Sequence, residues 1–150
     1  DSKPGVGVIA PNLNFAINIF SNVYLGITSS FQFINQYSNL SAENGNFQGH
    51  RKTLISPSLI FRPHYATFKL NYISEGDYQL LSKTISGRSL SYTKPSGFRI
   101  SALFFQFLNN NTGIYFETVR YSEQEVDGTE SELNSKLSTQ HYGIETTFRF

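Results

Sequence analysis

The chain has 150 residues, the size of a single domain, and a formal net charge of +1. Only 15% of its residues are charged, against about 25% in a typical soluble domain, and nothing in this charge predicts binding to nucleic acid. Cysteine is absent, which excludes disulfides, thiolate metal sites and thiol nucleophiles, and no motif predicts a cofactor.

Alternation of apolar and polar residues begins near the N-terminus and predicts β-strands. The first two predicted strands cover residues 12–20 and 23–33. In the second, Leu25, Ile27 and Phe33 share one face, and the opposite face is polar or small. A strand that crosses a bilayer at a tilt needs about 9–11 residues, so this run is long enough. No stretch approaches the roughly 18 apolar residues that predict a transmembrane helix.

The third and fourth predicted strands cover residues 51–62 and 65–74. Pro57 lies within the third and removes one backbone donor, which favours a bulge or a weakly paired position there. Lys69 lies in the middle of the fourth strand, on its polar face. An unpaired lysine is costly in the core of a small soluble sandwich, whereas the polar interior of a membrane barrel accepts it.

Three further strands are predicted, at residues 97–108, 113–122 and 139–150. The first of them is apolar on both faces near its end, so its orientation stays open. In the last, Tyr142 and Ile144 share a face that is opposite to a polar one. Aromatic residues gather at the strand ends, as expected for girdles at two membrane interfaces.

The connections alternate in length along the chain. Short turns are predicted at 21–22, 63–64 and 109–112, and long polar loops at 38–50, 75–96 and 123–138. Short turns on one side and long loops on the other are typical of outer-membrane barrels. We therefore expect an all-β, antiparallel, up-and-down transmembrane β-barrel. The rival fold is a soluble lipocalin-like barrel or sandwich, which would turn its apolar face inward.

With this pattern, the chain resembles the small outer-membrane β-barrel proteins of Gram-negative bacteria, the OmpX-like and OmpA-type barrels. The likeness covers nearly the whole chain and is most specific in residues 142–150, which alternate and end on the aromatic Phe150. Such an ending is similar to the signal that barrel-assembly machinery receives, although Gly143 lies farther from the end than is usual. The resemblance implies an integral outer-membrane location, with outer-membrane lipid and lipopolysaccharide as partners and no cofactor.

The expected number of strands is about eight, although only seven are clearly identified. Bacterial single-chain barrels have even strand numbers. The eighth strand is residues 5–10, or else residues 1–150 form the C-terminal part of a longer barrel rather than a complete one. An extra hairpin over residues 78–85 and 88–93 would add two strands and leave the number odd.

Charged residues on the polar face are expected to pair across the interior and seal it, because the lumen of an eight-stranded barrel is just wide enough to be filled by side chains. With Arg120 as the alternative to Glu117, the expected network consists of Lys69, Arg99, Glu117, Glu145 and Arg149. A small-solute channel is the alternative, and it needs mobile pairs or a larger assembly.

The third long loop carries a run of acidic residues, namely Glu123, Glu125, Asp127, Glu130 and Glu132. Charge runs of this kind are usually solvated. Binding of a divalent cation such as Ca²⁺ is the functional alternative, because it prefers carboxylate oxygens, although EF-hand spacing is absent.

His141 is expected on the inner face together with Glu145, with Ser138 nearby, and lipid-modifying outer-membrane hydrolases use such residues. The His-x-Ser pattern of lipid A deacylases is absent, so we do not expect an enzyme. The expected function is a structural or interaction role, with the chain as a subunit of an outer-membrane complex and its long loops as the contact surface. Channel and hydrolase functions are the alternatives.

Overall fold

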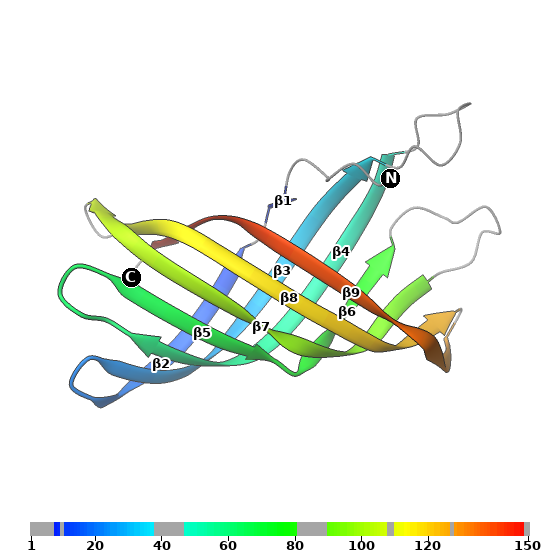
Figure 1. Ribbon diagram of the computed structural model, residues 1–150, viewed down its shortest axis with the longest axis horizontal. Helices are drawn as coiled ribbons and strands as arrows, with labels where there is room; N and C mark the ends of the chain where they lie inside the picture. Colours follow the sequence, from blue (N-terminus) through cyan, green and yellow to red (C-terminus); the bar gives the residue numbers. More distant parts are fainter. Residues whose placement is uncertain are drawn as a thin grey trace.

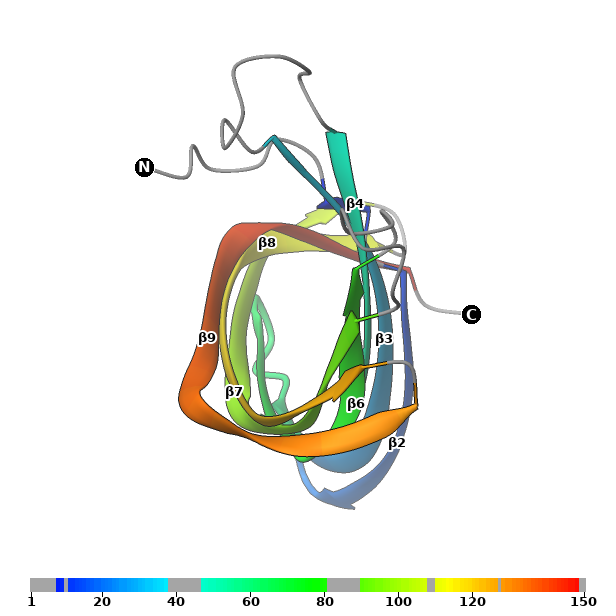
Figure 2. The ribbon, with the colours of Figure 1, turned by 90° about the vertical axis from the view of Figure 1, so that its right-hand side faces the viewer.

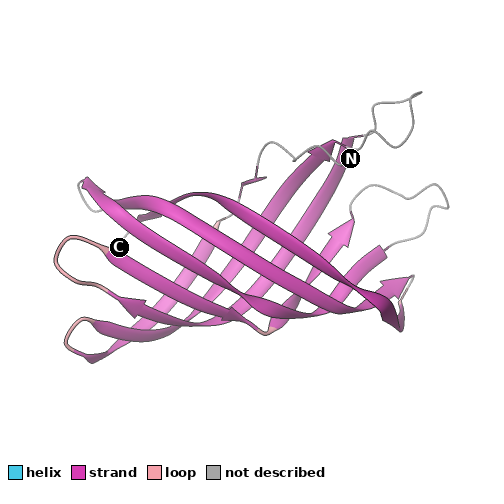
Figure 3. Ribbon diagram, viewed as in Figure 1, coloured by secondary structure: helices cyan, strands magenta, loops and turns pink. Residues whose placement is uncertain are grey.

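The computed structural model describes residues 8–9, 11–37, 47–80, 90–107, 110–126 and 128–148. These residues form a single antiparallel sheet of nine strand segments and contain no helix (Figures 1 and 3). The segments are β1 (Val8–Ile9), β2 (Asn12–Phe20), β3 (Val23–Tyr37), β4 (Phe47–Phe61), β5 (Thr67–Ile73), β6 (Glu75–Leu80), β7 (Leu90–Phe107), β8 (Asn110–Val126) and β9 (Thr129–Phe148). The predicted all-β, antiparallel, up-and-down fold is confirmed. Among these residues, no helix is long and apolar enough to cross a membrane.

In the part of the chain that is described, the nine segments occupy seven positions in the sheet. β1 and β2 both pair with β3, and β5 and β6 both lie between β4 and β7. The break between β5 and β6 falls at Ser74, just before Gly76, which has a φ of +133°. A side chain at Gly76 would collide with the backbone of Thr53, so this irregularity requires glycine.

The prediction of an eighth strand over residues 5–10 is wrong for its two described residues. Val8 and Ile9 pair with β3 just beyond the point where β2 leaves it, so β1 continues the line of β2. The carbonyl of Pro11 accepts a hydrogen bond from the backbone N–H of Phe31 at 3.0 Å, which keeps the chain beside β3 instead of turning it back. The extra hairpin over 78–85 and 88–93 is also wrong, because its described residues belong to β6 and β7.

The predictions of long loops are wrong for most of their described residues. β6 and the first part of β7 lie within the predicted loop 75–96, and the ends of β8 and β9 meet within 123–138. Backbone pairing continues there although neither face alternates clearly, because the hydrogen bonds of a ladder join backbone groups and do not require alternating side chains. These extensions define the long-hairpin end of the sheet, on the right in Figure 1, and the turns at 21–22 and 62–66 define the short-turn end, on the left.

The two faces of the curved sheet differ in polarity. Seen close to end-on, the strands surround a central space (Figure 2). Polar and charged side chains are buried, from Thr28 on β3 to Glu145 on β9, whereas 22 large hydrophobic side chains of the described residues are exposed. The apolar face therefore looks outward, opposite to what a lipocalin-like barrel requires.

An apolar cluster fills the interior toward the long-hairpin end. It consists of the buried residues Leu54, Ile73, Tyr78, Val119 and Tyr121, with Tyr92 and Leu137 packed against it. The polar zone lies next to this cluster, in the middle of the strands.

Candidate functional site: a buried ion network

Five charged residues on five strands meet in the interior, and each is at most 7% exposed. The register of the sheet brings them together. Glu117 on β8 lies opposite Arg99 on β7 and opposite His141 on β9, and residues that are directly opposite on antiparallel strands point to the same face. Lys52 on β4 and Lys69 on β5 share that face with Glu145 on β9.

Glu117 is the first of two carboxylates around which the network is organised. Lys52 Nζ donates to Glu117 Oε1 at 2.6 Å, and Gln32 Nε2 donates to Oε2 at 3.1 Å. Arg99 Nη1 lies 3.7 Å from Oε2, and His141 Nδ1 lies 3.6 Å from Oε1. Four side chains from four other strands thus converge on a carboxylate that is 1% exposed.

Glu145 is the second carboxylate. Lys69 Nζ donates to Glu145 Oε1 and, at 3.3 Å, to Thr147 Oγ1. Arg99 Nη2 and Ser101 Oγ donate to Glu145 Oε2 at 3.1 and 2.7 Å. Arg99 therefore links the two carboxylates, and the network contains three basic side chains, Lys52, Lys69 and Arg99, for two carboxylates.

The ring of Tyr115 packs against the guanidinium group of Arg99. The guanidinium carbon lies 3.9 Å from the centroid of the Tyr115 ring, the geometry of a cation–π contact. The ring in turn lies over Gly143 on β9, where an added Cβ would come within 3.1 Å of Tyr115 Cε1. Gly143 thus leaves room for the ring on which Arg99 rests.

Four of the five residues expected in the interior network are brought together by the structure: Lys69, Arg99, Glu117 and Glu145. Arg149 lies outside the described residues. Arg120, the alternative to Glu117, is exposed and lies on the outer face. Sequence reasoning did not single out Lys52, although it falls in a predicted strand and shares its face with Ser56 and Ser58. Extending the alternation by four residues from Ser56 toward the N-terminus would have found it.

The acidic run lies on the β8–β9 hairpin. Glu123 lies opposite Glu132, and Glu125 lies opposite Glu130, while Asp127 is outside the described residues. Lys94 Nζ donates to Glu123 Oε1 at 2.5 Å, and this hydrogen bond, with the charge of Glu123, raises the pKa of Lys94. No group of three or more potential metal ligands occurs in the described ranges. The suggested cation site therefore gains no support from the geometry.

The residues considered for a hydrolase do not form a catalytic arrangement. His141 faces inward toward Glu117, whereas Ser138 is exposed on the opposite face of β9. The hydroxyl that accompanies His141 on the inner face is that of Thr139, which donates to the carbonyl of Val119 and accepts from Lys52. This hydroxyl is held within the network and is not presented to a substrate.

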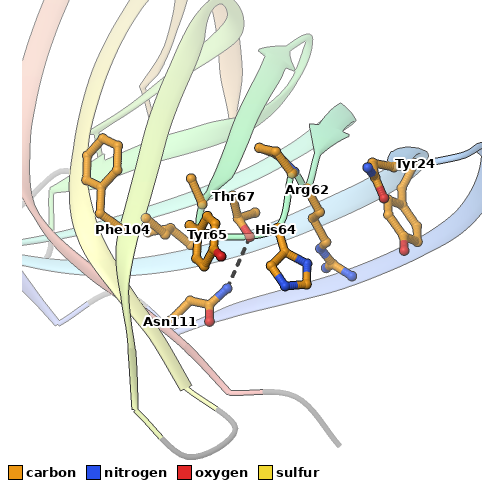
Figure 4. A pocket seen from close by; sticks show the side chains of 11 residues that line it. Tyr24, Arg62, His64, Tyr65, Thr67, Phe104 and Asn111 are labelled. Atoms are coloured by element: carbon orange, nitrogen blue, oxygen red, sulfur yellow. Dashed lines mark hydrogen bonds between the residues drawn. The ribbon is translucent and has the colours of Figure 1, made fainter.

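A cavity of about 290 Å³ opens at the short-turn end (Figure 4). Its lining includes Arg62, whose guanidinium carbon lies 4.6 Å from the Tyr24 ring centroid, and Asn111, which donates to Thr67 Oγ1 at 3.1 Å. Leu103, which is 1% exposed, also contributes to the lining. The cavity is polar and contains no carboxylate among its lining residues, so it does not extend the chemistry of the network.

Comparison with known proteins identifies no relative. No family model matches the chain, and neither curated proteins nor solved structures give a match. Function has to be inferred from the polarity of the two faces and from the network itself.

Proposed function

We propose that this protein is an integral β-barrel of a Gram-negative outer membrane, similar to the small OmpX-like and OmpA-type barrels, with a structural or interaction role. The polarity of the sheet carries this proposal, because charges are buried inside while large apolar side chains are exposed outside. In a soluble antiparallel sheet with one face in water, the apolar face packs on the core and the polar face is exposed. Transmembrane barrels alternate apolar-out and polar-in, with lipid against the outer face.

The boundary of the apolar band is visible in rows of outward residues that cross β7, β8 and β9. Ile100, Phe116 and Tyr142 form one such row. Two rows farther toward the long-hairpin end, the row consists of Ser96, Arg120 and Ser138. The change from apolar to polar within two rows supports a membrane interface there, and in the proposed orientation the hairpin extensions lie in water on the long-loop side.

Those extensions support an interaction role. β8 continues beyond Arg120 to Val126, and β9 begins at Thr129, so this hairpin stands clear of the apolar band. In this proposal, outer-membrane lipid contacts the apolar band. The hairpins contact lipopolysaccharide and other outer-membrane subunits.

The buried network supports a closed interior. Lys52 and Glu117 are 0% and 1% exposed, and the apolar cluster lies between them and the long-hairpin end. A conducting pore keeps its charges hydrated, whereas these charges are paired and dehydrated. Purified protein in planar lipid bilayers should show no stable conductance, and steady ion-selective steps would establish the channel instead.

Location in the membrane can be tested with single tryptophans, because the chain has none. Phe116→Trp places the probe in the apolar band, and Arg120→Trp places it on the same outer face of the same strand, beyond the band. In liposomes of lipids brominated on their acyl chains, the fluorescence of the Phe116→Trp protein should be quenched and blue-shifted. The Arg120→Trp protein is the matched control and should be quenched much less.

Two results would overturn the proposed location. One is equal quenching of the two proteins, which would remove the boundary between them. The other is a purified chain that stays monodisperse in buffer without detergent, since the exposed apolar band could not then be a membrane surface.

A further inference from the structure

Two neighbouring turns form much of the wall of the cavity at the short-turn end. The backbone N–H of Arg62, directly after β4, donates to the carbonyl of Asn22 in the β2–β3 turn at 2.8 Å. Within the β4–β5 turn, the backbone N–H of Ala66 donates to the carbonyl of Pro63 at 3.3 Å. Backbone hydrogen bonds therefore join the two turns, and the cavity between them has a defined wall.

The polar side chains around the cavity carry several hydrogen-bond donors. Arg62 contributes a guanidinium, His64 an imidazole and Asn111 a side-chain amide. In Figure 4 the polar ends of these three side chains lie along one side of the cavity. Among the described residues that line it, none is Asp or Glu. A fixed positive charge surrounded by donors favours an anionic ligand.

Aromatic rings orient both of the basic side chains. The guanidinium carbon of Arg62 lies 4.6 Å from the centroid of the Tyr24 ring, and the imidazole of His64 packs edge-to-face on the Tyr65 ring at 4.9 Å. A cation–π contact holds the guanidinium through its charge, whereas the N–H groups in its plane match two oxygens of a phosphate or carboxylate. Tyr24 therefore positions Arg62 without competing as an oxygen acceptor in that plane.

One side of the cavity is apolar and continues onto the outer face. Phe104 lines the cavity and is exposed, and its ring lies 6.0 Å from that of the exposed Phe68, which stacks on Phe61 at 6.4 Å. The register between β7 and β8 shifts between Leu103 and Phe105, so a β-bulge occurs at Phe104. Bulges redirect side chains in this way next to binding sites and at barrel rims. The polar cavity thus adjoins a row of aromatic rings on the outer face.

We propose that this cavity binds the phosphate group of a membrane phospholipid, whose acyl chains lie along Phe104 and Phe68. The inference rests on the proposed membrane location, which puts the short-turn end at the level of the lipid headgroups. Arg62 and His64 donate to the phosphate oxygens. The cavity has the volume of about ten water molecules, at about 30 Å³ each, and so accommodates a phosphate group. A free phosphate ion offers the same oxygens but gains nothing from the aromatic row.

The imidazole of His64 is the reporter for binding. The full chain, with isotope-labelled histidine, is folded in micelles of a maltoside detergent, which contains no phosphate. The chain has three histidines, and the resonances of His64 and His141 are assigned from the variants His64→Gln and His141→Gln. Dioctanoyl phosphatidylglycerol is the probe and should shift the His64 resonance until it saturates. The resonance of His141, in the buried network, should stay in place and shows that the fold is intact.

Two further probes separate the phosphate of a lipid from its acyl chains and from the free ion. Dioctanoylglycerol has the same chains without the phosphate and should cause no saturable shift at His64. Inorganic phosphate has the oxygens without the chains. It should bind about tenfold or more weakly than the phospholipid, because it does not bury the apolar surface of Phe104.

Substitutions of arginine test the donor. Arg62→Gln removes the charge and the fork of donors, and it should weaken phospholipid binding about tenfold or more, as expected for the loss of a hydrogen bond to a charged group. Arg62→Lys keeps the charge without the fork, should also bind more weakly than the parent, and carries the test if the glutamine variant does not fold. Arg120→Gln is the matched control, because Arg120 is exposed on the outer face toward the long-hairpin end, and it should leave the affinity unchanged.

Several results would overturn the proposal. The phospholipid could leave His64 unshifted, or dioctanoylglycerol could shift it equally. Inorganic phosphate that binds as tightly as the lipid would identify an adventitious ion only. Equal affinities of the Arg62→Gln and Arg120→Gln proteins would show that the cavity does not hold the phosphate. The tryptophan quenching uses neither His64 nor the cavity, so failure here leaves the membrane location standing.

Discussion

Arg99 lies directly opposite Glu117, yet its short hydrogen bond goes to Glu145 on β9, at 3.1 Å, while Nη1 stays 3.7 Å from Glu117. One guanidinium thus serves two buried carboxylates. A change at either carboxylate alters the electrostatic environment of the other, so the interior behaves as one coupled unit.

Glu117→Gln should destabilise the fold strongly. The substitution removes the only carboxylate that contacts Lys52 among the described residues and leaves that ammonium buried without a counter-charge. Removing one partner of a buried ion pair costs about 3–5 kcal/mol. The free energy of unfolding in urea, measured in liposomes, should fall by this amount. Glu132→Gln, at an exposed position of the β8–β9 hairpin, is the control and should change it little. Equal effects of the two substitutions would mean that the network does not stabilise the sheet.

Arg99→Lys should lower stability even though the charge is kept. An ammonium is a point charge and cannot reach two carboxylates in the fork geometry of a guanidinium or lie flat on the Tyr115 ring. We expect a loss of about 1.5–3 kcal/mol, the value of a hydrogen bond to a charged group. The same unfolding measurement tests this, and a Lys variant as stable as the parent would show that the shared position of Arg99 is unimportant.

Gly143→Val should destabilise by forcing the Tyr115 ring away from β9. A Cβ at this position already comes within 3.1 Å of the ring, so a branched side chain overpacks the site, at a cost of about 1–3 kcal/mol. In a protein that also carries Tyr115→Ala, the same valine should cost less than it does alone. Additive effects of the two substitutions would show that the ring and the glycine are not in contact.

Alkaline pH should weaken the apolar cluster at the long-hairpin end, outside the membrane band. Burial, helped by the nearby Tyr92, raises the pKa of Tyr78 to about 12, and burial likewise raises that of Tyr121. In the unfolded chain a tyrosine ionises near pH 10. The contribution of Tyr78 to stability is therefore complete below about pH 10 and is lost as the pH rises toward about 12.

The measurement is the melting temperature between pH 8 and pH 12, together with phenolate absorbance. Tyr78→Phe removes the ionisable group and keeps the ring, which lies 5.8 Å from that of Tyr121. The loss of melting temperature above pH 10 should be smaller in this variant. An unchanged pH profile would show that Tyr78 does not couple ionisation to folding.

Much of the fold could be predicted from alternation alone. The bounds of β2 agree with the prediction, and the inward face of β5, which carries Lys69, was identified because the strand alternates throughout. The ends of β6, β7, β8 and β9 could not be predicted. Both faces of the strands carry polar residues there, so the alternation of apolar and polar residues disappears. The break at Gly76 also could not be predicted from the sequence, because one extra residue in a strand does not change the amino-acid composition.

Four charged residues of the network, Lys69, Arg99, Glu117 and Glu145, were predicted from the sequence, but Lys52 and the pairing between the residues were not. Alternation places Glu117 and Glu145 on the inner face, but which cations they meet depends on the register between strands that are far apart in sequence. Gln32 reaches Glu117 across 85 positions of the chain. Such pairings depend on the register of each strand relative to its neighbour, and side-chain polarity alone does not determine this register.

The surplus of cations over carboxylates around Arg99 has an electrical consequence. Two lysines and one arginine face two carboxylates among the described interior residues, which leaves an excess of one positive charge there. Should a variant loosen the packing enough for ions to leak, the leak would favour chloride over sodium, because rings of lysine and arginine select anions. The sign of that leak would report directly on the residues that normally block it.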